Sequence, residues 1–126
     1  MTEKPKKNSG IIRILYAFMY TFNGLRYALM NEAAFRQETM LFVVALIAML
    51  FMPVSGIIKL LILLTSIIVL IVELLNSAIE AVVDKASPEY NELAKQAKDM
   101  GSAAVFLSFT AAGAVWIYAI VQMFKG

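Results

Sequence analysis

The stretch IIKLLILLTSIIVLIVELLNSAIEAVVD, residues 57–84, decides the fold. It is mostly apolar, with Lys59 near one end and Asp84 at the other. It is also longer than the roughly 20 apolar residues that a helix needs to cross a bilayer. Its second half nevertheless carries Glu73 and Glu80 among apolar neighbours. The pattern predicts a membrane-spanning helix with acidic groups inside it.

Composition indicates that lipid surrounds much of the remaining chain. Of 126 residues, 61% are hydrophobic and 16% are charged, whereas soluble domains are nearer half apolar and a quarter charged. A soluble domain of 13.9 kDa leaves too much surface exposed to bury such an excess. The sequence therefore predicts an all-α integral membrane protein with a single domain and no nucleic-acid partner.

Periodicity along the chain divides that domain into segments. Over about 10–31, apolar residues recur every three or four positions and polar residues occupy the opposite face. This amphipathic helix is expected to lie in the membrane interface, and the alternative is a soluble helix packed on a core. We expect a disordered basic tail at 1–9, followed by one membrane domain at 10–126. This domain would contain the interfacial helix at about 10–31 and three transmembrane helices at about 32–52, 57–84 and 98–124.

Two polar segments separate the expected spans. NEAAFRQE, 31–38, is a charged hinge, and from Glu38 to Met52 the first span is near the lower length limit unless the hinge extends the helix. The segment 85–99 contains Ser87-Pro88, a turn and helix-start signal. Of the 11 Lys and Arg residues, only Lys59 and Lys125 lie on the side opposite these segments. This bias predicts a cytoplasmic N-terminus and an external C-terminus.

Acidic and amide side chains share one face of the central span. At 100° per residue, a narrow sector contains Glu73, Asn76, Ser77, Glu80 and Asp84. They could simply join helices through hydrogen bonds, but two acids on one stripe require that one be protonated or that both share a cation. Because the chain has no His and no Cys, a bound metal would be a hard ion such as Mg²⁺.

Two further charged clusters are expected at the same membrane face. One is Glu32, Arg36 and Glu38 in the hinge, and the other is Lys98-Asp99 before the last span. Each could be an ordinary solvated cap. Glycine-rich nucleotide motifs are absent from the sequence. Because three spans do not enclose a polar site, we expect a homo-oligomer with sites between helices.

NEAAFRQE at 31–38, VELLNSAIEAVVD at 72–84 and SPEY…AKQAKDMGSAAV at 87–105 resemble the prokaryotic diacylglycerol kinase family, over about residues 10–120. The resemblance implies a homotrimer in the bacterial inner (cytoplasmic) membrane, with active sites shared between subunits at the cytoplasmic face. It implies transfer of the γ-phosphate of ATP to 1,2-diacylglycerol, with Mg²⁺, giving phosphatidic acid.

The resemblance also assigns roles to residues. Glu73 would be the catalytic base with Asn76 beside it, and Glu32 and Glu80 would hold the Mg²⁺. Contacts to ATP would come from these two acids and from Arg13, Tyr20, Glu89, Tyr90, Asn91, Lys98 and Asp99. The lipid would meet Arg13, Arg26, Arg36, Glu38, Glu73 and Ser102.

Three other interpretations remain open. Gram-positive members of the family phosphorylate undecaprenol instead of diacylglycerol. Intramembrane acids on short helices also suit a small proton-coupled transporter, in which Glu73 would carry protons. A purely structural assembly factor would make Glu80 dispensable.

Overall fold

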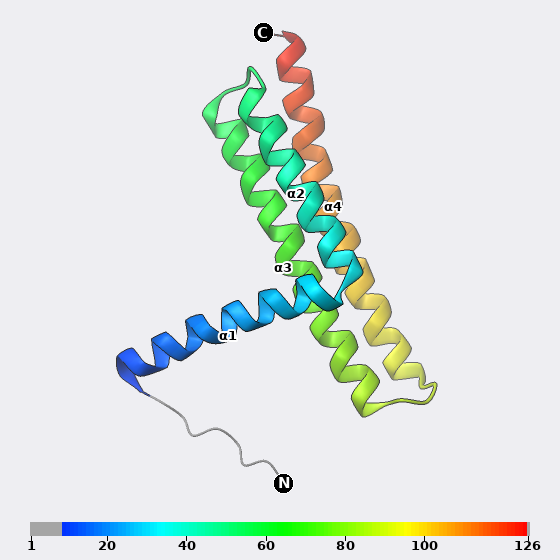
Figure 1. Cartoon of the computed structure of the whole chain (residues 1–126). Helices are drawn as coiled ribbons and strands as arrows, with labels where there is room; N and C mark the ends of the chain where they lie inside the picture. Colours follow the sequence, from blue (N-terminus) through cyan, green and yellow to red (C-terminus); the bar gives the residue numbers. More distant parts are fainter. Residues whose placement is uncertain (1–8, 126) are drawn as a thin grey trace.

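A computed structural model describes residues 9–125, which form four helices. They are α1 (Gly10–Asn31), α2 (Ala33–Phe51), α3 (Gly56–Ala86) and α4 (Glu92–Lys125) (Figure 1). Within the described residues there is no strand, and α2, α3 and α4 are each long and apolar enough to cross a membrane. The predicted all-α membrane fold is confirmed, whereas the predicted tail lies, apart from Ser9, outside the described residues.

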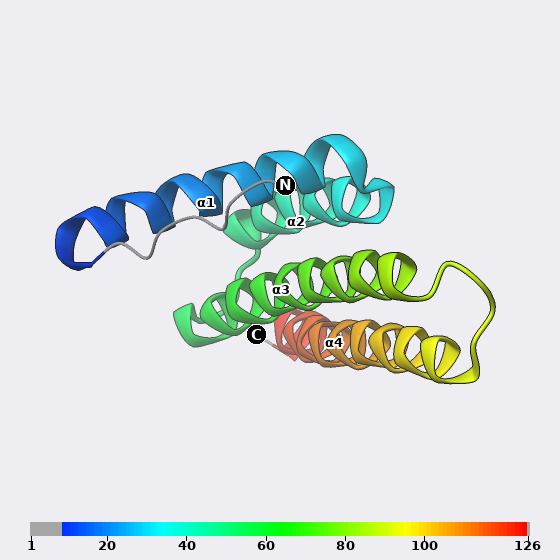
Figure 2. The same ribbon diagram turned by 90° about the horizontal axis from the view of Figure 1, so that it is seen from below.

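The three long helices form an antiparallel bundle with α3 at its centre. Helix α3 contacts both α2 and α4, and its contact with α4 is the more extensive. Helix α1 runs across the bundle instead of along it, and α3 and α4 continue past α1 before the turn that joins them (Figure 1). Seen from below, α1 lies on the α2 side of the bundle, away from α4 (Figure 2). The site described below lies where α1, α2 and α3 approach one another.

The packed core is small and lies near the end of the bundle opposite α1. Ile62 and Ala119 are fully buried there, and Met49 and Ile58 pack around them. Most other large apolar side chains are exposed, including those of all three spanning helices. This exposure is expected for helices whose outer faces meet lipid tails, because such faces need no protein partner.

Within the predicted hinge, 31–38, the helix is broken at a single residue. Glu32 leaves helical geometry, with φ −108° and ψ 105°, while residues from Ala33 onwards are already helical. Arg36 stabilises the break, since its Nη1 donates to the carbonyl oxygens of Leu29 at 3.1 Å and Met30 at 3.0 Å at the end of α1. These carbonyls have no partner within the helix. Residues 33–38 of the predicted hinge therefore belong to α2, so the first spanning helix is the longer of the two expected alternatives.

The link between α3 and α4 is shorter than the expected polar segment 85–99. Helix α3 continues to Ala86 and α4 begins at Glu92, before the expected span. Asn91 causes the early start, because its Oδ1 accepts from the backbone N–H of Leu93 at 2.9 Å and of Ala94 at 3.3 Å, as an N-cap residue does. Ser87 does not begin a helix, and its Oγ donates to the carbonyl of Glu89 at 3.1 Å.

Candidate active site

The acidic face of α3 changes from buried to exposed along the helix. Glu73 and Asn76 are 5% and 8% exposed. Ser77 and Glu80 are half-buried, and Asp84, near the turn into α4, is exposed. The predicted sector of polar residues therefore forms a path from the interior of the bundle to the end where α3 and α4 meet.

Glu73 meets a second carboxyl group from α2. The Glu38 and Glu73 side chains are close enough to interact directly, and Glu38 Oε2 is buried with no hydrogen-bond partner. Glu32 and Glu80 lie near enough for their charges to act on Glu73 as well. Within residues 9–125 the two ion pairs are Lys95–Asp99 and Lys98–Asp84, so these four carboxyl groups have no cationic partner there.

The donor set suits a hard cation that arrives with a phosphate ligand. Among the described residues, no three acidic, His or Cys side chains lie close enough to hold a metal by themselves. Mg²⁺ is commonly bound by one or two carboxylates plus substrate phosphates and water. Glu32 and Glu80, both half-buried, fit this arrangement, whereas they would not form a permanent protein-only metal site.

Asn76 lies between the two acids of α3. Its Nδ2 donates to Glu80 Oε1 across a long 3.5 Å contact. Its Oδ1 is buried and has no hydrogen-bond partner. Asn76 therefore helps to orient Glu80.

The turn between α3 and α4 gathers five of the predicted ATP contacts. A pocket of about 430 Å³ is lined by Glu89, Tyr90, Asn91, Lys98 and Asp99, together with Asp84 and other residues of the turn. Lys98 Nζ lies 2.5 Å from Asp84 Oδ1, and Lys95 Nζ lies 2.7 Å from Asp99 Oδ2. Lys98 and Asp99 are therefore each already held by a partner on α3 or α4.

The other predicted ATP contacts lie elsewhere. Tyr20 lines a pocket of about 380 Å³ between α1 and α3, together with Glu32 and Ser77, and its ring stacks on Tyr16. Arg13 lines a different pocket formed by α1 residues. Within one copy of the chain, eight of the nine predicted ATP contacts are thus spread over three pockets, and Glu80 lines none of the three.

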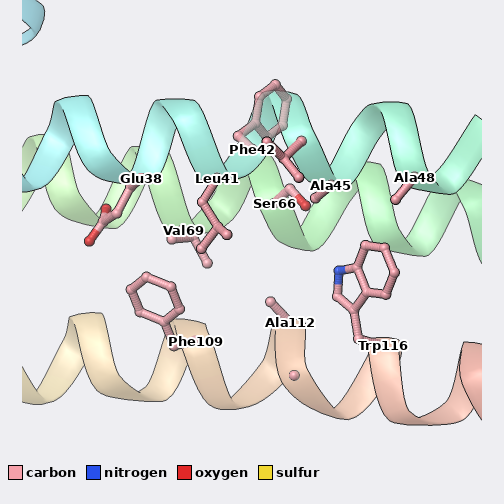
Figure 3. Close-up of a pocket in the computed structure, with 12 residues that line it drawn as sticks. Glu38, Leu41, Phe42, Ala45, Ala48, Ser66, Val69, Phe109, Ala112 and Trp116 are labelled. Atoms are coloured by element: carbon pink, nitrogen blue, oxygen red, sulfur yellow. The ribbon is translucent and has the colours of Figure 1, made fainter.

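An apolar groove runs between α2 and α4, with α3 as its floor (Figure 3). Its volume is about 410 Å³. Glu38 lies at one end and Trp116 towards the other, with Phe109 and Ala112 of α4 facing α2 between them. The groove thus leads from the half-buried Glu38, beside the buried Glu73, along an apolar surface between two spanning helices.

Of the residues predicted to meet lipid, Glu38 alone lines this groove. Glu73 lies beside Glu38, while Ser102 and Arg26 are exposed on α4 and α1. Arg36 is engaged with the end of α1.

Comparison with known proteins identifies the family. A family model described as prokaryotic diacylglycerol kinase matches residues 19–120. The chain belongs to this family. It is 46% identical over 108 residues to a diacylglycerol kinase of Escherichia coli K12, covering 86% of this chain and 88% of the relative. A Pseudomonas aeruginosa diacylglycerol kinase is 45% identical over 117 residues, covering 92% and 95%.

Similarity extends to more distant members of the diacylglycerol kinase family. A Haemophilus influenzae diacylglycerol kinase is 37% identical over 110 residues, covering 87% of this chain and 93% of the relative. The matched range 19–120 contains every predicted site residue except Arg13. The predicted family is therefore confirmed. Because these relatives are named diacylglycerol kinases, diacylglycerol is favoured over undecaprenol as the substrate.

Sequence reasoning did not find the groove. Its α4 wall consists of Phe109, Ala112, Gly113 and Trp116, which are apolar or small residues in an apolar span. Apart from Trp116, nothing in the sequence separates these residues from those that face lipid tails. Trp116, as the one tryptophan of the chain, was the available signal, because its ring carries an N–H that favours a polar or interfacial position.

Proposed function

We propose that the chain transfers the γ-phosphate of ATP to the primary hydroxyl of 1,2-diacylglycerol at the cytoplasmic face of a bacterial membrane, giving phosphatidic acid. The observation that carries the proposal is the meeting of Glu38 and Glu73 at the end of an apolar groove. A lipid whose chains occupy the groove would bring its hydroxyl to a buried acid. Family membership supplies the identity of that lipid.

Glu73 is the group that accepts the hydroxyl proton. Phosphoryl transfer requires in-line positioning, charge neutralisation and a residue that takes or orients the proton of the attacking group. Glu73 is buried and lies beside the groove, so water is kept from the reacting hydroxyl. Asn76, one turn further along α3, orients Glu80 through Nδ2.

Glu32 and Glu80 would hold the Mg²⁺ that accompanies ATP. When bound, this ion neutralises the phosphate oxygens and stabilises the charge of the transferring group. Lys98 supplies further positive charge from the turn between α3 and α4, where its ammonium can donate to Asp84 and to a phosphate at once because it has three N–H donors.

The crossing of α1 over α3 supports the proposed depth of the site. Helix α1 borders α3 at Leu74, Ser77, Ala78 and Ala81. If α1 lies in the interface plane, Glu73 is just inside the membrane, and Asp84, about 16 Å further along the helix, reaches the aqueous side. Lipid and nucleotide then approach the same acids from opposite directions.

Three copies of the chain complete each site. The separation of Arg13 and Tyr20 from Lys98 in different pockets supports this arrangement. So does the exposure of nearly the whole of α1, in which Ala28 is the buried residue. In a trimer, a second subunit can bring its α1 or its turn to the acids of the first.

The test is a lipid-kinase assay on the full chain in detergent micelles or bilayers. With ATP, Mg²⁺ and 1,2-diacylglycerol, we expect phosphatidic acid and ADP in equal amounts. Glu73→Gln should lower kcat by about 10²-fold or more, the range for loss of a general base. Thr65→Val is a matched control, because Thr65 is a polar residue of α3 whose hydroxyl donates to its own helix.

Other results would assign another function. Faster turnover of undecaprenol than of diacylglycerol would overturn the proposed substrate. No lipid-dependent ADP release, together with a proton flux that Glu73→Gln abolishes, would identify a transporter. Full activity of Glu73→Gln would remove Glu73 as the base.

A further inference from the structure

Gly101 of α4 lies directly against Asn76 of α3. Gly101 is buried, and a side-chain Cβ at this position would overlap Asn76 Oδ1 and stand 3.3 Å from its Cγ. At Gly56 and Gly113, by contrast, a Cβ would meet nothing within 4 Å. Gly101 is therefore a point of close helix approach, as small residues commonly are in membrane bundles.

The amide that occupies this space has one favourable orientation. Asn76 is 8% exposed, its Oδ1 has no hydrogen-bond partner, and its Nδ2 points to Glu80 Oε1. Exchanging the amide oxygen and nitrogen would set two acceptors against each other, because an ionised carboxylate accepts and does not donate. The oxygen must therefore face Gly101, where only backbone and Cα hydrogens can meet it.

We propose that Gly101 is a positioning residue for the phosphoryl-transfer site. Its missing side chain gives the Asn76 amide a seat between α3 and α4, and this seat keeps Nδ2 directed at Glu80. The catalytic consequence rests on the proposed function, whereas the seat itself is a property of the helix contact.

A methyl group at position 101 leaves Asn76 two responses. The amide can rotate out of the contact, or α3 and α4 can move apart. If the amide rotates, Nδ2 loses its contact with Glu80. If the helices move apart, Gly101 no longer confines the amide. In both cases the carboxylate proposed to hold Mg²⁺ is less firmly oriented. Rotation of the amide about the Cβ–Cγ bond would relieve the overlap with Oδ1 but would leave Cγ 3.3 Å from the added methyl carbon, so the contact would stay tight.

A double-mutant cycle tests the seat without reference to activity. The variants are Gly101→Ala, Asn76→Ala and the pair, in the full-length protein, with the thermal unfolding midpoint as readout. We expect Gly101→Ala to lower the midpoint in the native background and to change it little beside Asn76→Ala, which removes the overlapping atoms. If Gly101→Ala shifts the unfolding midpoint equally in the two backgrounds, or in neither, Gly101 does not make room for the Asn76 amide.

Gly113→Ala is the matched stability control, since it makes the same change on the same helix where space is open. Alanine is the better helix former, so its midpoint should stay or rise. A fall as large as that of Gly101→Ala would mean that any added methyl group on α4 is harmful, which contradicts a specific seat.

Kinetics tests the positioning role. Gly101→Ala should lower kcat at least about tenfold and raise the Mg²⁺ concentration for half-maximal rate, with KM for diacylglycerol unchanged. Gly56→Ala, at the far end of α3, serves as the activity control. Native kcat and Mg²⁺ dependence in Gly101→Ala would overturn the positioning role. If the native protein has no kinase activity, the proposed function is wrong, and so is the catalytic role of Gly101. The double-mutant cycle would still test whether Gly101 makes room for the Asn76 amide.

Discussion

Lys98 Nζ lies 2.5 Å from Asp84 Oδ1, joining the first turns of α4 to the last turns of α3. Both side chains are solvent-exposed to a substantial degree, at 43% and 64%. Exposed ion pairs of this kind add little to folding stability. We infer that the main effect of the pair is to hold the flexible Lys98 side chain beside the pocket at the α3–α4 turn.

Asp84→Asn is therefore expected to raise KM for ATP by about three- to tenfold and to change kcat little. The asparagine keeps the size of the side chain but no longer holds the ammonium, so Lys98 must be ordered when the nucleotide binds. Initial rates at varied ATP and saturating diacylglycerol measure the effect. Asp84→Glu should recover most of the native KM. A lower KM in Asp84→Asn would mean that Asp84 competes with phosphate for Lys98.

The spanning helices could be predicted from the sequence because hydrophobic length alone specifies them. Their ends could not, because these depend on single capping interactions. Glu32 interrupts the chain although its neighbours are good helix formers, and Arg36 stabilises the break by reaching back to carbonyls of α1. At the start of α4, Asn91 supplies the cap, and the Ser87-Pro88 signal is the more conspicuous one in the sequence.

Within the site, the sequence revealed what one helix arranges and missed what two helices arrange. The spacing of Glu73, Asn76 and Glu80 places them on one face of α3 whatever the surroundings. The approach of Glu38 to Glu73 depends on the register of α2 against α3, and the approach of Gly101 to Asn76 depends on the register of α4. Register between apolar helices is set by small differences in packing, which hydropathy does not encode.

Glu80→Gln should raise the Mg²⁺ concentration for half-maximal activity by about tenfold or more, the range for a changed metal environment. The amide retains the shape of Glu80 and can still accept from Asn76 Nδ2, so the helix contact is preserved while the ligand charge is lost. Titration of the rate with Mg²⁺ at fixed ATP measures the shift. An unchanged Mg²⁺ dependence would show that Glu80 does not hold the ion.

Ala112→Phe should obstruct the groove between α2 and α4. Ala112 faces α2 from the wall of α4 (Figure 3), so a large ring there would occupy the space proposed for an acyl chain. We expect KM for long-chain diacylglycerol to rise by about tenfold, KM for short-chain diacylglycerol to rise less, and KM for ATP to stay constant. Ala114→Phe, which does not line the groove, is the matched control. Equal effects on both lipids would argue against the groove as the acyl site.

Ile62→Ala tests whether the bundle is held by packing. Ile62 and Ala119 are both 0% exposed where α3 meets α4. Because lipid tails are as apolar as isoleucine, the loss should come mainly from the cavity, and we expect about 2 kcal/mol, the low end of the range for such changes.

Unfolding by a denaturing detergent in mixed micelles measures this loss. Leu61→Ala, at a neighbouring position that is 40% exposed, should lose less than half as much because lipid fills the space that the side chain leaves. Kinase activity of the folded Ile62→Ala protein should match the native rate, since Ile62 lies about 16 Å along α3 from Glu73. Similar losses at positions 61 and 62 would mean that the α3–α4 contact contributes no packing energy at this level of the bundle.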